Sequence, residues 1–332
     1  MEDKVATQEL VEPQAEVVER FRHDLDALID AQHPIGVAVS GGPDSLALLA
    51  LAAAARPGLV EAATVDHSLR PEARAEAEMV AGVCRVLGVP HETLTVKWAK
   101  TPDTAVQERA RIARYKLLGQ WARNRGLKSV LTAHHLDDQA ETFMMRLARG
   151  AGVRGLAGMR RSAPVPGSDM ALLRPLLGWR RMELEQICSE FGLTPANDPS
   201  NADEQFERVR VRRGLAGAGW LNSRAVAISA QNLAEADGAL RWATSKAWDH
   251  SVTEEGGEIL FVPQDIPREI RRRIVLRAVT RLATEGQGAE LRGRELERVL
   301  GTLARGGKAT VRGVLCSGGR QWRFSKAPPR RS

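Results

Sequence analysis

Residues 40 to 45 combine glycine, serine and aspartate in a pattern that suits phosphate binding. The run reads Ser40-Gly41-Gly42-Pro43-Asp44-Ser45 and lies between an apolar stretch and an apolar helical pattern. Glycines let the backbone approach a phosphate closely, and the start of the following helix offers free N–H groups and a positive dipole end. The hydroxyls of Ser40 and Ser45 can donate to phosphate oxygens. We therefore predict that this run binds the phosphates of a nucleotide.

Asp44 is the unusual member of the run, because a carboxylate beside phosphates makes sense mainly with a cation between them. Mg²⁺ prefers such oxygen ligands, so Asp44 is predicted to hold Mg²⁺. The alternative is a glycine-rich tight turn in which Asp44 only complements the helix dipole. The run lacks the Lys-Ser/Thr ending of the nucleotide loop that grips a transferring γ-phosphate.

Three acidic residues begin another helical pattern directly after an apolar run. They are Asp137, Asp138 and Glu141, and His134 and His135 precede them. Asp138 and Glu141 are three residues apart and lie roughly on one helix face, where they suit a metal or an amine. The alternative is a capping box, with Asp138 as N-cap and Glu141 as the third helical residue. Adjacent histidines cannot share a metal through that spacing alone, so His134 and His135 are predicted to contact substrate or to pack rather than to bind zinc.

Two arginines, Arg111 and Arg114, lie three residues apart on one predicted helix. A guanidinium aimed at an α-phosphate or at leaving pyrophosphate would stabilise developing charge. The alternative is a solvated helix face with Glu108 as ion-pair partner. Asp66 and His67 follow a predicted strand and could bracket the nucleotide or only shape the turn.

These residues depend on an alternation of strand and helix patterns through about residue 150. Strands are predicted at 35–39, 60–65, 92–96 and 129–133, and helices at 17–30, 45–55, 72–87, 104–126 and 138–149. Strict alternation with continuous apolar strands predicts an α/β fold, in which a parallel sheet is covered by helices on both faces. Ligands of such sheets bind at the carboxyl ends of the strands, where the residues described above gather.

The remainder of the chain changes character near residues 150 and 216. Residues 150–167 are rich in glycine, arginine and proline and predict a loop or lid, and a helix is expected from Arg180 to Phe191. Further helices are predicted at 225–248, 268–284 and 292–304, before a terminal hairpin with strands at 309–315 and 321–324. We expect an N-terminal helical extension at 1–32, a catalytic domain at 33–216, a smaller, mainly helical domain at 217–327 and a disordered tail at 328–332.

Composition restricts the classes of protein to consider. Of the 332 residues, 43% are hydrophobic and 27% charged, as in ordinary globular proteins. The longest apolar run falls well short of the ~18 residues of a membrane span, and the N-terminus lacks the pattern of a secretory signal. A cytoplasmic protein with no membrane contact is therefore predicted. The three cysteines form neither a disulfide framework nor a metal-binding spacing.

Charge is unevenly distributed along the chain. Residues 1–32 hold nine acidic and three basic side chains, a net charge of −6, so the +7 of the whole chain leaves +13 for the remainder. Such a basic body favours a polyanionic partner such as nucleic acid, although many basic proteins bind none. A second arginine group could form an RNA surface or only a solvated helix face; it comprises Arg271, Arg272, Arg273, Arg277 and Arg281.

The run at residues 40–45 matches the SGGxDS signature of the ATP pyrophosphatase, or PP-loop, superfamily, which cleaves ATP between the α and β phosphates. Other motifs resemble those of the tRNA(Ile)-lysidine synthase family in order and spacing. They are VDHSLRPE at 65–72, ARIARY at 110–115, AHHLDDQAET at 133–142, RPLL at 174–177 and NDPSN at 197–201. The resemblance covers residues 33 to 215, and compared with longer family members the chain is expected to lack an additional C-terminal domain.

This resemblance implies ATP and Mg²⁺ as cofactors, and free L-lysine and an isoleucine tRNA with a CAU anticodon as partners. ATP would adenylylate the wobble cytidine, and the ε-amine of lysine would then displace AMP to give lysidine. Catalytic roles are implied for Asp44, Asp137, Arg111 and Arg114, with Asp137 holding Mg²⁺ or the lysine ammonium. Contacts with tRNA or substrate are predicted for His134, Asp138, Glu141 and Asn201. A dense cationic run shortly after Asn201 is predicted from its charge to contact the tRNA backbone; it comprises Arg208, Arg210, Arg212 and Arg213.

Some features leave alternatives open. The usual Arg-Asn pair of the family is Arg208-Val209 here, which weakens any role of this segment in reading a particular nucleotide. A tRNA thiolation enzyme of the same superfamily is the main rival, but sulfur transfer normally needs a cysteine pair or a cluster that this sequence lacks. A binding module without activity is disfavoured because both Asp44 and Asp137 are present. The oligomeric state is open, with a homodimer as one prospect.

Overall fold

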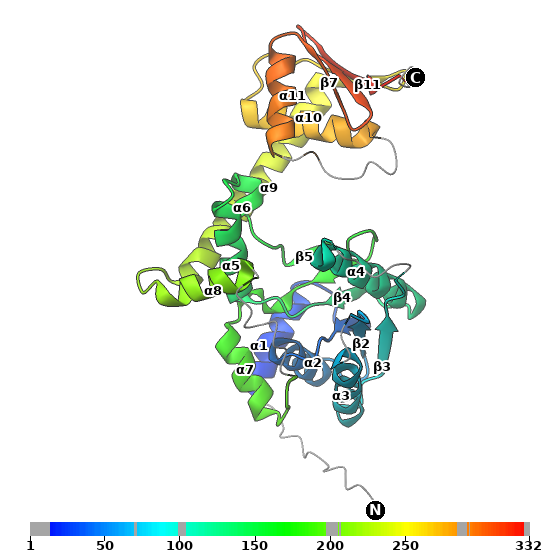
Figure 1. Ribbon diagram of the computed structural model, residues 1–332, viewed down its shortest axis with the longest axis vertical. Coiled ribbons are helices and arrows are strands. Elements are labelled where there is room, and N and C mark those ends of the chain that lie inside the picture. The colour runs from blue at the N-terminus through cyan, green and yellow to red at the C-terminus, as the bar shows by residue number, and fades with distance from the viewer. Residues whose placement is uncertain are drawn as a thin grey trace, which may run out of the picture. The chain divides into compact units, whose positions relative to one another are not determined.

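The computed structural model describes residues 14–69, 72–98, 104–196, 205, 207–283, 291 and 293–328 (Figure 1). The chain divides into two compact units, Met1–Ala234 and Glu235–Ser332, and the division lies inside helix α9 (Ser223–Ser251). The change of character expected at residue 216 lies beside the break between α8 (Glu207–Gly217) and α9. The predicted domain limits remain predictions.

The first unit is built on a six-stranded sheet. Its strands, in spatial order, are β3 (His91–Thr95), β2 (Val60–Asp66), β1 (Ile35–Ala38), β4 (Ser129–Leu131), β6 (Ala171–Leu173) and β5 (Ser162–Pro164). Every neighbouring pair is parallel except β5 with β6. The predicted α/β fold with a parallel sheet is therefore confirmed, and all four strands predicted from the sequence are present.

One prediction for this unit was wrong. The segment at 150–167 was predicted to be a loop or lid, but it also contains a short helix and a strand. It contains the short helix α6 (Val153–Leu156) and the edge strand β5, which forms a hairpin with β6. The turn is closed by a hydrogen bond from the N–H of Val165 to the carbonyl of Met170 at 2.7 Å. Strands of three residues are too short to give an alternating apolar pattern, which is why neither was predicted.

Helices cover both faces of this sheet, as the alternation of side chains along each strand requires. One core contains Leu131 and Leu173 and packs against α1 (Ala15–Asp26), α2 (Pro43–Ala55), α3 (Glu72–Val86) and α7 (Arg181–Glu190). The other contains Val130 and Leu172 and packs against α4 (Val106–Asn124). Because α2 is apolar almost throughout and its residues 46–52 are fully buried, it is a central helix rather than an amphipathic surface one.

The carboxyl ends of the parallel strands meet at one edge of the sheet. There β1 leads into the loop at 40–45, β2 ends at Asp66, β4 leads into α5 (Leu136–Leu147), and β6 leads into Arg174 and the short 3-10 helix η1 (Pro175–Gly178). The start of α5 is tied to the end of η1 by a hydrogen bond from the N–H of Leu136 to the carbonyl of Trp179 at 2.8 Å. Residues distant in sequence are thus collected at one edge.

The second unit contains a five-stranded antiparallel sheet as well as helices. Its strands, in spatial order, are β7 (Val252–Glu255), β8 (Glu258–Phe261), β11 (Trp322–Lys326), β10 (Val314–Ser317) and β9 (Lys308–Val311). The helices α10 (Arg268–Leu282) and α11 (Gly293–Ala304) share its core, which includes Phe261 and Phe324. The hairpin of β7 and β8 was not predicted, although Gly256-Gly257 between two strand-like runs is a hairpin signal.

The predicted terminal hairpin is present but begins differently. The expected strand at 309–315 is two strands, β9 and β10, which pair with each other through a two-residue turn at Arg312 and Gly313. Both turn residues have positive φ, 51° and 71°, as tight hairpin turns require. β10 then pairs with β11 as expected. Residues 329–332 of the predicted tail lie outside the described residues.

Candidate active site

The loop between β1 and α2 folds around the hydroxyl of Ser45. This hydroxyl donates to the carbonyl of Gly42 at 2.9 Å and accepts from the N–H of Ser40 at 3.1 Å. Ser45 is buried, whereas Ser40 is exposed. Ser45 therefore braces the loop, and Ser40 is the hydroxyl that a phosphate could reach. The predicted phosphate contacts of both residues remain predictions.

The two glycines of the loop bring the backbone to the start of α2. Gly41 has a φ of 86°, which favours glycine, and its carbonyl accepts from the N–H of Ala196 at 2.9 Å. Gly42 is the N-cap of α2 and Pro43 stands in the first turn. The first N–H groups of a helix lack partners within the helix and, with its dipole, attract an anion. The geometry therefore suits a phosphate.

The ring of His135 lies among three carboxylates. Its Nε2 is 3.5 Å from Oδ2 of Asp44 and 3.6 Å from Oδ2 of Asp138, and its Nδ1 is 3.8 Å from Oδ2 of Asp137. Burial acts to lower the pKa of His135, but the hydrogen bond to Asp44 and the charges of Asp138, Asp44 and Asp137 raise it above its ordinary value. From the sequence, His134 and His135 were treated alike and a site role was predicted for His134 alone, because two adjacent histidines give no sign of which ring turns toward the acids.

The cap of α5 differs from the one considered as an alternative. His135, not Asp138, is the N-cap, and Asp138 is the third helical residue. The N–H of His135 donates to Oδ2 of Asp138 at 3.1 Å, and the N–H of Asp138 donates to Nδ1 of His135 at 3.4 Å. This reciprocal capping box begins the helix two residues earlier than predicted. Asp138 therefore does take part in capping α5, but as the third helical residue, with His135 as its partner.

Asp44 has the property expected of a magnesium ligand. Its Oδ1 is buried and has no hydrogen-bond partner among the described residues. A buried carboxylate oxygen without a partner is costly unless a cation or a ligand satisfies it. No group of three or more His, Cys, Asp or Glu side chains within the described ranges is arranged to hold a metal. Mg²⁺ would fit here only by sharing its ligands between Asp44 and phosphate oxygens, as it does in many nucleotide sites.

Asp137 fits a metal less well than Asp44 does. Its Oδ2 accepts from the N–H of Arg181 at 2.8 Å, and its Oδ1 is 3.5 Å from Nε of Arg180. Asp137 thereby caps the start of α7 and faces that helix. The assignment of Asp137 to Mg²⁺ or to an ammonium group remains a prediction.

The neighbouring His134 turns toward arginines. Its Nδ1 is 2.9 Å from Oγ1 of Thr132. Burial and then the charges of Arg174, Arg208, Arg114 and Arg111 hold the pKa of His134 well below its ordinary value. His134 and His135 therefore face regions of opposite charge, a basic group and an acidic group, at the same strand end.

Arg111 and Arg114 both lie against the ring of Tyr115, with their Cζ atoms 4.9 Å and 5.2 Å from its centroid. Among the described residues neither forms an ion pair with Glu108, although Arg111 lies on an exposed part of the helix as the alternative of a solvated face expected. The catalytic roles of both arginines remain predictions. Burial lowers the pKa of Arg114, and the charge of Arg111 lowers it further.

The basic group also includes two arginines that were not predicted, Arg146 and Arg174. Burial, followed by the charge of Arg111, lowers the pKa of Arg146. Burial also lowers the pKa of Arg174, partly offset by Tyr115. Each gives a hydrogen bond to a backbone carbonyl, that of Gly155 for Arg146 and that of Arg160 for Arg174. The RPLL motif was the sequence signal that could have identified Arg174.

The predicted tRNA-contacting arginines of α8 pair with the acids of α5. Arg208 donates from Nε to Glu141 at 2.6 Å and from Nη2 to Asp138 at 2.7 Å, and Arg212 donates from Nε to Glu141 at 2.6 Å. Arg210 donates to the carbonyl of Gln205 at 3.0 Å. Arg208 and Arg212 thus dock α8 on α5, and their contact with RNA remains a prediction.

Replacing Glu141 with alanine should lower the free energy of unfolding by about 1–3 kcal/mol. Glu141 is buried, and its loss leaves Arg212 without its carboxylate and Arg208 with Asp138 alone. The same change at Glu185, which makes an exposed pair with Arg181, should cost less than about 0.5 kcal/mol. Urea unfolding of both variants measures the difference. Equal losses would show that the pairing of α5 with α8 contributes little.

The remaining predicted contacts have local structural partners or lie outside the described residues. Oδ1 of Asp66 accepts from the N–H of Ser68 at 2.7 Å, and the carbonyl of His67 accepts from the indole of Trp98 at 2.7 Å. Both residues thus shape the turn after β2, and a nucleotide contact stays a prediction. Asn201 lies outside the described residues.

A pocket of about 220 Å³ lies beside Asp137, where α5, α7 and α8 meet. It is lined by Asp137, Glu141, Arg180, Arg181, Met182, Arg212, Leu215, Ala216 and Ser223. The lining thus combines two carboxylates, three guanidiniums and apolar side chains. Such a set suits a small molecule that carries both charges and an aliphatic stem.

The low pKa of His134 predicts how stability depends on pH. A histidine whose folded pKa is depressed contributes stability above the unfolded pKa of 6.5, and this contribution is lost as the pH falls below it. His134→Asn, whose amide can replace Nδ1, should remove this dependence. The free energy of unfolding of wild type relative to this variant should fall by about 1.4 kcal/mol per pH unit between pH 6 and 5. Urea titrations at each pH measure this difference in the free energy of unfolding. His33→Asn is the control, because His33 is exposed. A difference between wild type and His134→Asn that does not change with pH would contradict the prediction.

Comparisons with known proteins now identify the chain. A family model described as "PP-loop domain" matches residues 13–218. The tRNA(Ile)-lysidine synthase of Novosphingobium aromaticivorans is 49% identical over 317 residues, covering 94% of both chains, and that of Zymomonas mobilis is 42% identical, covering 90% of this chain and 89% of that one. The chain belongs to the tRNA(Ile)-lysidine synthase family. It is therefore an ATP-dependent enzyme that modifies tRNA, and the resemblance predicted from its motifs is confirmed.

Within the wider superfamily, the lysidine synthase fold is shared by enzymes of different chemistry. A U34-tRNA thiolase from Methanococcus maripaludis, solved with its [4Fe-4S] cluster, superposes with a TM-score of 0.56 at 16% identity, covering 66% of this chain and 77% of that one. This likeness concerns the fold alone.

Searched over its described residues, the chain has no helix that is both long and apolar enough to cross a membrane.

Proposed function

We propose that the protein adenylylates the C2 oxygen of the wobble cytidine in an isoleucine tRNA with a CAU anticodon and then attaches free L-lysine. The observation that carries this proposal is the division of charge at one strand end, where three carboxylates lie within 3.8 Å of His135 and the positive charges of four arginines act on His134. The acidic side adjoins the phosphate-binding loop through Asp44. An enzyme that joins a polyanionic substrate to a cationic amine needs both regions side by side.

In the first step, the cytidine oxygen attacks the α-phosphorus of ATP, and the bond to pyrophosphate breaks. The N-terminus of α2 and Ser40 would hold phosphate oxygens, and Asp44 would hold Mg²⁺, which supplies charge neutralisation when bound. Arg111 and Arg114, which have no carboxylate partner among the described residues, would stabilise the charge that develops on the leaving pyrophosphate. The product is an adenylylated base that carries a good leaving group.

In the second step, the ε-amine of lysine attacks C2 of the base, and AMP leaves with the C2 oxygen. The amine must first lose a proton. Asp137 borders the pocket of about 220 Å³ and would hold the ε-ammonium there. The arginines of that pocket would bind the α-carboxylate of lysine, while Met182 and Leu215 would contact its aliphatic stem.

The cysteines argue against sulfur transfer, the main alternative to lysine transfer. Cys84, Cys188 and Cys316 are all buried, and burial raises the pKa of each thiol, to about 12, about 11 and about 12. A nucleophilic cysteine instead needs a lowered pKa and access to its substrate.

Radiolabelled lysine provides the direct test. The purified protein, incubated with ATP, Mg²⁺, labelled lysine and bulk bacterial tRNA, should put label into acid-precipitable RNA. The label should survive mild alkali, because a lysine bonded to a base is stable where an ester is hydrolysed. Pyrophosphate release stimulated by tRNA without lysine incorporation would retain the adenylylation step but overturn lysine as nucleophile.

A further inference from the structure

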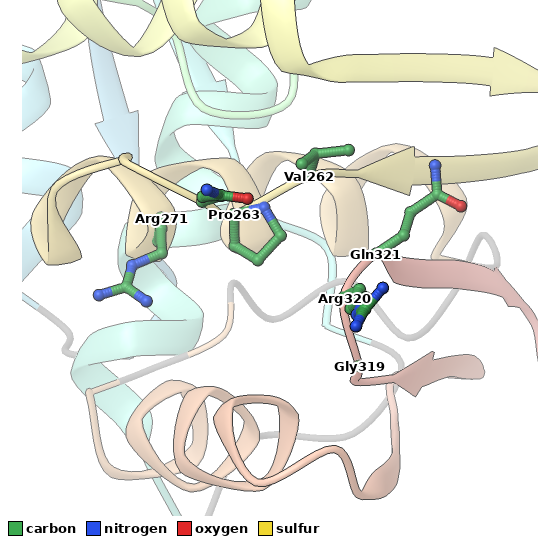
Figure 2. A pocket seen from close by; sticks show the side chains of 7 residues that line it. Val262, Pro263, Arg271, Gly319, Arg320 and Gln321 are labelled. Carbon is green, nitrogen blue, oxygen red and sulfur yellow. The ribbon is translucent and has the colours of Figure 1, made fainter.

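The second unit has a pocket of about 570 Å³ that the proposed chemistry does not use (Figure 2). It lies where β8 and β11 end their pairing, because Phe261 and Trp322 are the last paired residues and Val262 and Gln321 directly adjoin them. The lining comprises Val262, Pro263, Gln264, Arg271, Gly319, Arg320 and Gln321. None of these residues is acidic, and two are arginines.

Arg271 differs from the other arginines of α10. Arg268, Arg272, Arg273 and Arg281 pair with carboxylates, and Arg277 lies over the ring of Trp248. Arg271 has no side-chain partner among the described residues, and its Nε is buried without a hydrogen bond. The basic face of α10 is thus mostly neutralised within the protein, and its one unpartnered guanidinium lines the pocket.

Arg320 supplies the second charge from a tightly packed turn. The preceding Gly318 donates to the carbonyl of Gly307 at 2.8 Å, and a Cβ added at Gly318 would lie 2.1 Å from the carbonyl oxygen of Leu303. Only glycine allows this approach, so the turn is held against α11. Arg320 itself has no side-chain partner among the described residues. Figure 2 shows Arg271 on one side of Pro263 and Val262, with Arg320 and Gln321 on the other.

We propose that this pocket binds a phosphodiester of the RNA substrate. Two unpartnered guanidiniums and two glutamine amides provide donors for phosphate oxygens. Val262, Gln264 and Arg320 are exposed, so the pocket is open, as a polymer that continues on both sides requires. A free phosphate shares this chemistry but would gain little from so open a site. The inference rests on the proposed function only in taking RNA as the substrate.

The test compares two double variants of the full-length protein. R271A/R320A removes the two unpartnered arginines, whereas R268A/R323A removes two arginines from α10 and β11 that pair with Glu297 and Glu258. Binding of labelled tRNA is measured by fluorescence anisotropy between 50 and 300 mM salt. R271A/R320A should lower the magnitude of the slope of log K against log salt by about 1, because the two arginines are proposed to bind one phosphate. R268A/R323A, which loses the same charge, should retain a slope close to that of wild type.

Further measurements separate the outcomes. Equal slopes for the two variants would overturn the proposal, and the charge-retaining R271K/R320K variant should recover most of the wild-type slope if folding is intact. Inorganic phosphate at matched ionic strength should not displace tRNA. If it displaces tRNA from wild type but not from R271A/R320A, the pocket binds free phosphate and the proposal fails. Because RNA binding is measured without lysine transfer, loss of the proposed function would not imitate any of these results.

Discussion

Replacing Asp44 with asparagine should lower tRNA-dependent pyrophosphate release by about a thousandfold or more, equivalent to about 4 kcal/mol of activation free energy. Asparagine keeps the shape of the side chain and removes its charge. Oδ2 of Asp44 lies beside His135, but Oδ1 is buried beside the phosphate-binding loop without a partner among the described residues, which leaves it available to a cation that also binds phosphates. The affinity for tRNA should remain within about twofold, since Asp44 serves the ATP end of the reaction.

The alternative role of Asp44 gives a different result. If Asp44 only complements the dipole of α2, Asp44→Asn should cost about 0.3–1 kcal/mol of stability and leave the rate of pyrophosphate release unchanged. Glu16→Gln is the matched control, because Glu16 is an exposed acid in the first turn of α1. Measurement of both unfolding and release in the two variants distinguishes the roles. A variant that is slightly less stable but fully active would contradict a metal-binding role.

The parts of the fold that could be predicted from sequence are those that depend on local patterns. Apolar runs such as 35–39 and 129–133 correspond to strands β1 and β4, and the glycine-rich run at 40–45 lies between β1 and α2 as expected. Because the carboxyl ends of parallel strands lie at one edge of a sheet, predicting a parallel sheet was enough to bring the segments that follow these strands together. The approximate place of the site followed from this rule.

What could not be predicted depends on contacts between distant residues. The pairing of Glu141 with Arg208 and Arg212 joins residues about seventy positions apart, and nothing in the spacing of either helix indicates it. The choice of His135 over Asp138 as N-cap depends on where the chain leaves β4, which a sequence pattern fixes only to within a few residues. The short strands β5 and β6 depend on pairing with their neighbours in the sheet, since β6 pairs with β4 and β5 and β5 pairs with β6.

Replacing both Arg111 and Arg114 with alanine should lower the rate of adenylylation by about 10²–10⁴-fold at saturating ATP and tRNA. Burial already lowers the pKa of Arg114, and Arg111 lowers it further. Burial and mutual repulsion make it costly in free energy to keep two charged guanidiniums close together. Because neither has a carboxylate partner among the described residues, we expect them to bind an anion. If that anion is the leaving pyrophosphate, kcat should fall more than KM for ATP rises, because the interaction strengthens as charge develops.

Arg109 provides the matched control, because it lies on the same helix, is exposed, and makes no described ion pair. Arg109→Ala removes a positive charge from α4 and should change kcat by less than about twofold. R111K/R114K keeps both charges but loses the planar geometry of the guanidinium, so it should recover only part of the rate. If the alanine variant instead weakens tRNA binding while kcat stays at the wild-type value, the two arginines hold the RNA backbone. The stabilisation of pyrophosphate would then fall to Arg146 and Arg174, whose pKa values are lowered in the same basic group.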